Sequence, residues 1–304
     1  MTLQTLVLLV LKASILLTVF AIGLRASAYD ATYLFRRPRQ LFRVLLATNV
    51  LLPAFAIGLA LLFNLNRAIE IALIALAVSP LPPILPKKLL KSGTSEPYAI
   101  GSLVAIGLLS IIFVPGAMEI LERVFNVPLR TTLASIAVLV FVTIVLPLSL
   151  GIAVNRLAPH VAERLVSPAA KIGTVGLLIS VITILFSTAS SIWALVGNGT
   201  LVAMAVFVAV ALAIGHFLGG PEPQNRAALA MATASRHPGI AIALSTANFP
   251  EEKLAMPAVL LYLLVNLVVS IPYLLWTKRQ KPIEETQGEG RHSDLENIRP
   301  STND

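Results

Sequence analysis

The chain has 304 residues, of which 57% are apolar and only 12% are charged, and its mean hydropathy is +0.86. This composition lies outside the range of soluble globular domains and predicts an integral membrane protein. The absence of cysteine excludes disulfides, thiolate metal sites and cysteine nucleophiles. The net charge of +8 comes from short Lys and Arg clusters between apolar runs, which are typical of membrane topology signals and not of nucleic-acid binding.

About nine apolar runs are long enough to cross a membrane, which predicts an all-α polytopic fold. They form one transmembrane domain over residues 1–277, with halves of about 1–130 and 131–277, and the polar residues 278–304 are predicted to be a disordered cytoplasmic tail. The first run is not a signal peptide by pattern, because its positive charges follow the run. The expected crossings are Leu3–Leu24, Leu41–Phe63, Ala68–Leu90, Tyr98–Leu121, Thr131–Leu157, Ala169–Ile192, Thr200–Leu218, Gln224–Asn248 and Leu254–Trp276.

Lys and Arg residues gather in alternate loops, namely those after the first, third, fifth and ninth crossings. The intervening loops are uncharged or mix positive with negative residues. The positive-inside rule therefore places the N-terminus outside and the C-terminus in the cytoplasm. We expect an integral protein of the bacterial inner (plasma) membrane, with the lipid bilayer as its surroundings.

Two of the expected crossings are interrupted by residues that break helices. The third contains four prolines between Pro80 and Pro86, and the eighth carries the run Arg236–Pro238 followed by a glycine. The two interruptions occupy corresponding positions in the two halves and run through the membrane in opposite directions. Such paired breaks predict an inverted repeat whose broken helices form the binding site of a secondary transporter. The alternative is that the prolines only kink packed helices.

The eighth crossing also carries polar residues at helical spacing. Asn225 and Arg236 are eleven residues apart, as are Gln224 and Ser235, so each pair is expected on one helical face. Arg236 is a candidate for binding a carboxylate or sulfonate, and the alternative is an internal ion pair with Glu222 or another acidic residue.

His237 is the second ionisable residue at the interruption of the eighth crossing. Histidine titrates near neutral pH, so this residue suits a proton relay in a proton-coupled carrier. The alternative is that its ring donates a hydrogen bond to a backbone carbonyl at the break.

Four stretches together carry a family resemblance that covers residues 6–276. Phe20–Leu24 with Phe35–Pro38, Asn49–Pro53, Ser79–Gly93 and Glu222–Ala230 resemble motifs of the bile acid:sodium symporter family, within a wider set of bile-acid, arsenite and auxin carriers. The resemblance implies a panel domain and a core domain, with two broken helices that cross near the middle of the membrane. It also implies ten helices, of which we expect this chain to lack the first, and a cavity lined by Thr48 and Asn49.

The chain departs from the family pattern where sodium is bound. In the family, a Gly-Gly and a Ser-Asn pair in the first crossover help to hold sodium, and these places read Pro, Leu, Ile and Lys here. The family glutamate stands four residues before Gln-Asn, where this chain has Gly220, and Glu222 is displaced by two residues. Too few oxygen ligands remain at matching positions, which speaks against sodium coupling and leaves H+ as the other candidate coupling ion.

We expect a secondary active transporter that moves a small organic anion by alternating access, and the alternative is a non-transporting sensor or partner subunit with the same fold. An enzyme is not expected, because there is no phosphate-cradling loop, nucleophile elbow or carboxylate pair, and no cofactor is implied. The candidate residues for binding solute or ion are Thr48, Asn49, Ser79, Pro80, Pro83, Glu222, Gln224, Asn225, Ser235, Arg236, His237 and Pro238.

Overall fold

The computed structural model describes residues 3–91, 94–125 and 132–279, and these residues form helices and no strand. Seven helices in this part of the chain are long and apolar enough to cross a membrane. The prediction of an all-α polytopic membrane protein is thereby confirmed. The predicted tail lies, from residue 280 onward, outside the described residues.

The seven continuous crossings follow the predicted apolar runs closely, and two contain a short π-helical segment. The largest difference is at the sixth crossing, which was expected to begin at Ala169 but begins at Pro159, because proline suits the first turn of a helix and a charged extension precedes the apolar part. The crossings are α1 (Leu3–Gly23), α3 (Pro38–Leu45) with η1 (Leu46–Leu51) and α4 (Leu52–Leu62), α7 (Glu96–Phe125), α8 (Leu133–Val140) with η2 (Phe141–Val145) and α9 (Leu146–Leu157), α10 (Pro159–Ser187), α12 (Thr200–Leu218) and α15 (Ala255–Arg279), and short helices α2 (Ala28–Thr32) and α11 (Ala189–Ala194) lie in connections.

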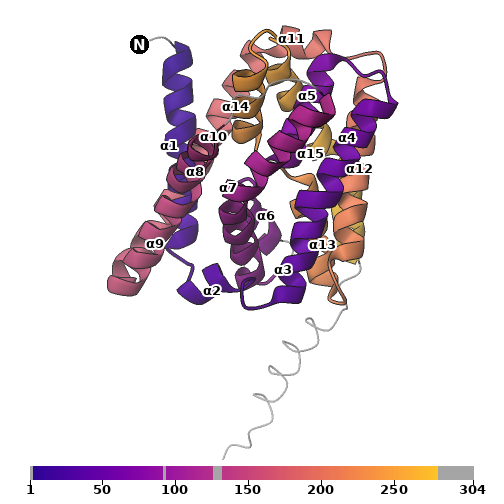
Figure 1. Ribbon diagram of the computed structural model, residues 1–304. Coiled ribbons are helices and arrows are strands. Elements are labelled where there is room, and N and C mark those ends of the chain that lie inside the picture. The colour runs from indigo at the N-terminus through magenta and orange to yellow at the C-terminus, as the bar shows by residue number, and fades with distance from the viewer. Residues whose placement is uncertain (1–2, 92–93, 126–131, 280–304) are drawn as a thin grey trace, which may run out of the picture.

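The two predicted interruptions are real breaks in the helices. The first separates α5 (Arg67–Val78) from α6 (Leu85–Lys91), and the second separates α13 (Pro223–Ala234) from α14 (Pro238–Asn248). Figure 1 shows α5 and α14 at one end of the molecule and α6 and α13 below them, so the two broken helices run in opposite directions. α14 packs against α5, and α13 packs against α6. Each half of one broken helix therefore has a half of the other as its neighbour.

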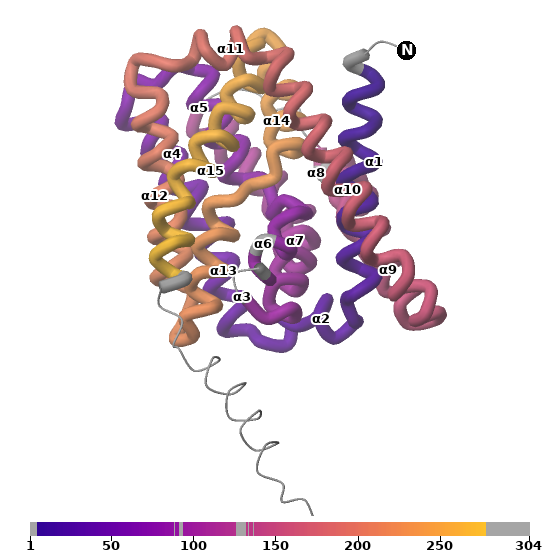
Figure 2. The backbone as a smooth tube through the Cα atoms, turned by 180° about the vertical axis from the view of Figure 1, so that it is seen from behind, coloured from indigo at the N-terminus to yellow at the C-terminus, as the bar shows by residue number. Residues whose placement is uncertain are grey.

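Two groups of helices lie on opposite sides of the molecule in both views, with α6 and α7 between them. α1, α9 and α10 pack against one another on one side, while α4, α5 and α12 to α15 pack together on the other (Figures 1 and 2). In the first group, Gly23 and Gly151 let two helix backbones touch, since a Cβ at Gly151 would lie 2.7 Å from the Cα of Gly23.

Candidate functional site

The two breaks meet in the interior of the second group of helices. The backbone N–H of His237 donates a hydrogen bond of 2.9 Å to the carbonyl of Pro80, which joins one break directly to the other. Ser79 and His237 are both buried, as are Pro80 and Pro83. The crossing of the broken helices is therefore a compact polar region inside an apolar core, as transporter binding regions are.

Arg236 lies at the centre of this crossing and is almost completely buried, with 1% of its surface exposed. Its Nε donates to the carbonyl of Leu76 at 3.1 Å, and its Nη2 donates to the carbonyls of Ala77 at 2.5 Å and Thr48 at 3.1 Å. The remaining nitrogen, Nη1, is buried without a hydrogen-bond partner among the described residues. The guanidinium is thus held by backbone oxygens, and the alternative of an internal ion pair with Glu222 or another acid of the described residues is wrong.

Proline chemistry explains why the carbonyls of Thr48 and Leu76 are free to accept these bonds. In the π-helical segment η1, the N–H of Leu52 bonds to the carbonyl of Ala47, five residues earlier. The next bond in this register would join the nitrogen of Pro53 to the carbonyl of Thr48, but proline has no N–H. Pro80 likewise provides no N–H for the carbonyl of Leu76, which instead accepts from Ser79 and Arg236.

His237 caps the helix that follows the second break. Its Nδ1 accepts a hydrogen bond of 3.3 Å from the backbone N–H of Ile240, in the first turn of α14. The expected donation to a backbone carbonyl is therefore wrong, because the free N–H groups at a helix start need an acceptor. The other ring nitrogen, Nε2, is buried without a partner among the described residues. Gly239, two residues on, is exposed, so the start of α14 is accessible from the surface.

Tyr262 on α15 completes the crossing and was missed in the sequence. Its hydroxyl donates a hydrogen bond of 2.6 Å to the carbonyl of Ala234, the last residue of α13. A tyrosine in a long apolar run carries no pattern that would have revealed this contact. The carbonyl end of α13 is thus satisfied by a neutral hydroxyl, whereas the carbonyl end of α5 is satisfied by a cation.

The predicted polar face of the eighth crossing does not run through to the break. α13 ends at Ala234, so the helical spacing that linked Asn225 with Arg236 is interrupted before Arg236. Asn225 donates instead to the carboxylate of Glu222 in the first turn of α13, and Gln224 is exposed. Proline and the residue before it cannot continue the helix, which explains the early end.

The remaining predicted residues lie close to the crossing. Thr48 and Asn49 are buried in η1, where the Thr48 hydroxyl lies 2.8 Å from the carbonyl oxygen of Val44 and 2.9 Å from Asn49 Oδ1 and donates its one proton to one of them. Ser235 is buried between α13 and Arg236, and Pro238 begins α14. The structure therefore brings together Thr48, Asn49, Ser79, Pro80, Ser235, Arg236, His237 and Pro238, and it leaves Glu222, Gln224 and Asn225 at the far end of α13.

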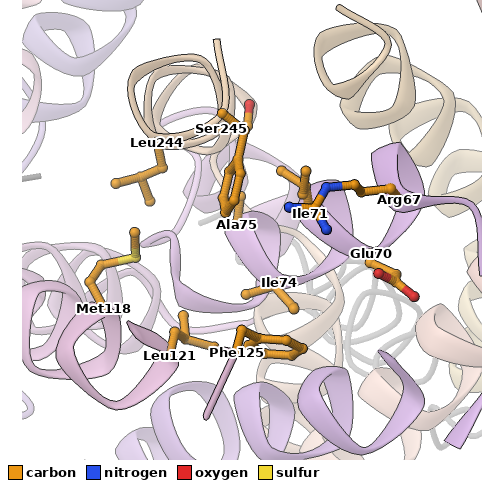
Figure 3. A pocket seen from close by; sticks show the side chains of 11 residues that line it. Arg67, Glu70, Ile71, Ile74, Ala75, Met118, Leu121, Phe125, Leu244 and Ser245 are labelled. Atoms are coloured by element: carbon orange, nitrogen blue, oxygen red, sulfur yellow. The ribbon is translucent and has the colours of Figure 1, made fainter. Parts of the chain in front are cut away.

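A pocket of about 100 Å³ lies along α5 and α14, between one end of the molecule and the crossing. Its walls are mainly apolar and come from α5, α7 and α14, with Arg67 and Glu70 as its charged residues. Figure 3 shows the guanidinium of Arg67 beside Ile71, and the Glu70 carboxylate directed away from Met118 and Leu244.

The comparison with protein families decides what kind of protein carries this crossing. The model of the Sodium Bile acid symporter family matches residues 13–196, which is more than half of the chain. The chain belongs to this family. The Sodium Bile acid symporter family comprises transporters and not enzymes, so this is an integral membrane protein of the small-molecule transporter type. The matched region contains the first broken helix and ends before the second. A comparison with curated proteins found no match.

The family's name implies a bound sodium ion, and the residues where the two broken helices cross show whether such an ion would fit there. A hard cation needs several oxygen ligands that converge on one point. The carbonyl oxygens of Thr48, Leu76 and Ala77 do converge, but they are bound to Arg236. Within the described residues, no group of three or more His, Cys, Asp or Glu side chains is placed to hold a metal ion. The crossing of this chain therefore does not fit a sodium ion.

Proposed function

We propose that this protein is a secondary active transporter that carries a small organic anion by alternating access. The observation that carries the proposal is the meeting of two oppositely directed broken helices at the hydrogen bond from His237 to Pro80. Breaks of this kind leave backbone dipoles and polar groups in the middle of a membrane, where they would be costly without a binding role. The separation of the helices into two groups supports a movement of one group against the other (Figure 1).

The charges near the pocket support an anionic solute. Arg67 makes no salt bridge, since the only one within residues 3–91, 94–125 and 132–279 joins Arg123 to Glu119. The Arg67 guanidinium stands 5.8 Å from the centre of the Phe249 ring, next to apolar walls. A guanidinium binds carboxylate or sulfonate groups through paired hydrogen bonds. The solute class that fits is an organic acid with an apolar body that fills the pocket.

Transport by the purified full-length chain in proteoliposomes tests the proposal. Vesicles loaded with a mixture of unlabelled organic carboxylates and sulfonates are placed in the same mixture in labelled form, and uptake is measured for each acid. We expect saturable counterflow of at least one apolar acid, because a carrier exchanges solute without net driving force. Binding of an acid without counterflow would instead identify the sensor or partner subunit that the sequence leaves as the alternative.

A matched pair of variants tests the role of the pocket. Arg67→Gln removes the charge beside the apolar walls and is expected to raise KM about tenfold or more, the usual cost of losing a hydrogen bond to a charged group. Arg123→Gln is the control, because Arg123 lies at the end of α7 with 76% of its side chain exposed. Equal KM values for the wild type and Arg67→Gln would rule out this pocket as the place where the anion binds.

A further inference from the structure

Arg236 differs from an ordinary buried arginine in what neutralises its charge. Buried charges in proteins are normally paired with an opposite charge, because an unpaired ion in a membrane interior is costly. Arg236 makes no salt bridge in the part of the chain that the structure describes, and its three hydrogen bonds go to backbone carbonyls. Its charge is therefore balanced by peptide dipoles alone.

The three carbonyls belong to two elements, α5 and η1, and each element is followed two residues later by a proline. Leu76 and Ala77 belong to the last turn of α5, where the helix dipole concentrates negative charge, and Thr48 belongs to η1. Pro80 and Pro53 remove the N–H groups that would otherwise occupy two of these oxygens. The Leu76 oxygen accepts from Ser79 as well, but it lacks the usual helical donor four residues on. Oxygens that have lost their helical donors and converge on one point form a cation-binding position, as in carbonyl-lined ion sites.

We propose that Arg236 is a tethered cation, whose guanidinium permanently occupies this carbonyl-lined position and replaces a bound sodium ion at the crossing of the broken helices. This cation is a side chain of the protein itself and stands at the second break, two residues after the end of α13. Ion binding and release at the crossing are then unnecessary. Where the proposed transport function holds, flux through this protein does not depend on a sodium gradient.

Thermal unfolding of the full-length protein in detergent tests the tethered cation without any knowledge of the solute. The wild type is expected to have the same Tm in sodium chloride and in choline chloride, because no sodium ion binds at the crossing. Arg236→Ala should lower Tm by about 5–10 °C, since it leaves buried carbonyls without donors. Guanidinium or methylguanidinium at low millimolar concentration should then raise the Tm of Arg236→Ala, because a ligand that binds the folded state stabilises it. Arg123→Ala, at a side chain that is 76% exposed and lies away from the crossing and the pocket, is the control that should show no such rise.

A second pair of variants separates the charge from the hydrogen bonds. Arg236→Lys keeps the positive charge, whereas Arg236→Gln keeps hydrogen-bond donors without charge, so the lysine variant should be the more stable of the two. This comparison decides the matter even where Arg236→Ala fails to fold. The proposal is overturned by a saturable stabilisation of the wild type by sodium, by a glutamine variant as stable as the wild type, or by a folded alanine variant that responds equally to guanidinium and choline.

The outcome for the tethered cation is separate from the outcome for transport. A protein with the expected Tm pattern but no counterflow of any organic acid would retain the tethered cation and lose the proposed transport function. An active carrier that is stabilised by sodium would retain the transport function and lose the tethered cation.

Discussion

The packing of α12 against α13 gives a sharp test of how the site helix is positioned. Gly215 on α12 and Gly219, the residue that caps its C-terminal end, are four residues apart and face α13, in the spacing that lets membrane helices touch through their backbones. A Cβ added at Gly215 would stand 2.6 Å from the backbone nitrogen of Ala230 and closer still to its Cα. Because the obstructing atoms belong to the α13 backbone, no side chain can rotate to make room.

Gly215→Ala is therefore expected to push α13 away from α12 and to strain the helix break that follows α13. The added Cβ falls about 0.8 Å inside the 3.4 Å of ordinary contact. Overpacking of this kind costs about 1–3 kcal/mol. At about 2–4 °C per kcal/mol for chains of this size class, the expected loss in Tm is about 2–12 °C.

The assay is thermal unfolding in detergent, followed by size-exclusion chromatography of the remaining folded protein. Gly58→Ala in α4 is the matched control, since nothing lies within 4 Å of a Cβ at that position. Alanine has the higher helix propensity, so the Gly58 variant should be as stable as the wild type or more stable. A Gly215 variant that unfolds with the wild type, or a Gly58 variant that loses as much as Gly215→Ala, would refute the packing argument.

Two further changes test the hydrogen bonds at the second break. Tyr262→Phe removes the hydroxyl that satisfies the carbonyl end of α13 and should destabilise the fold by about 1 kcal/mol. The control is Tyr29→Phe, at a half-exposed ring, which should have no effect on Tm. Equal Tm values for the two variants would contradict this role of Tyr262. His237→Ala should cost about 1 kcal/mol by removing the cap of α14, and His237→Asn should recover most of that loss because asparagine is a good capping residue. An asparagine variant with normal stability but no transport would show that the imidazole does more than cap the helix.

The placement of the crossings could be predicted from the sequence with little loss. The seventh crossing, Thr200–Leu218, has the same bounds in the sequence prediction and in the structure. Such agreement follows from one physical constraint, since the hydrocarbon core of a bilayer demands apolar runs of nearly constant length. The two breaks were equally predictable, because proline removes a backbone donor wherever it stands.

The contacts of the polar residues were not predictable in the same way. Arg236 was weighed between a solute and the carboxylate of Glu222, and the structure gives it the backbone carbonyls of Leu76, Ala77 and Thr48. A carbonyl acceptor has no residue identity in the sequence, and whether it is free depends on the helical register around it.

The sequence by itself therefore determined the membrane class, the positions of the crossings and the two breaks, because these follow from hydrophobic length and proline chemistry within short segments. The tertiary structure alone decided that the breaks meet, that Tyr262 closes the end of α13 and that Arg236 occupies the carbonyl end of α5. Arg236 is more than 150 positions from its carbonyl partners on α5, and Tyr262 is 28 positions from Ala234. Only the packing of the helices brings these residues within hydrogen-bond distance.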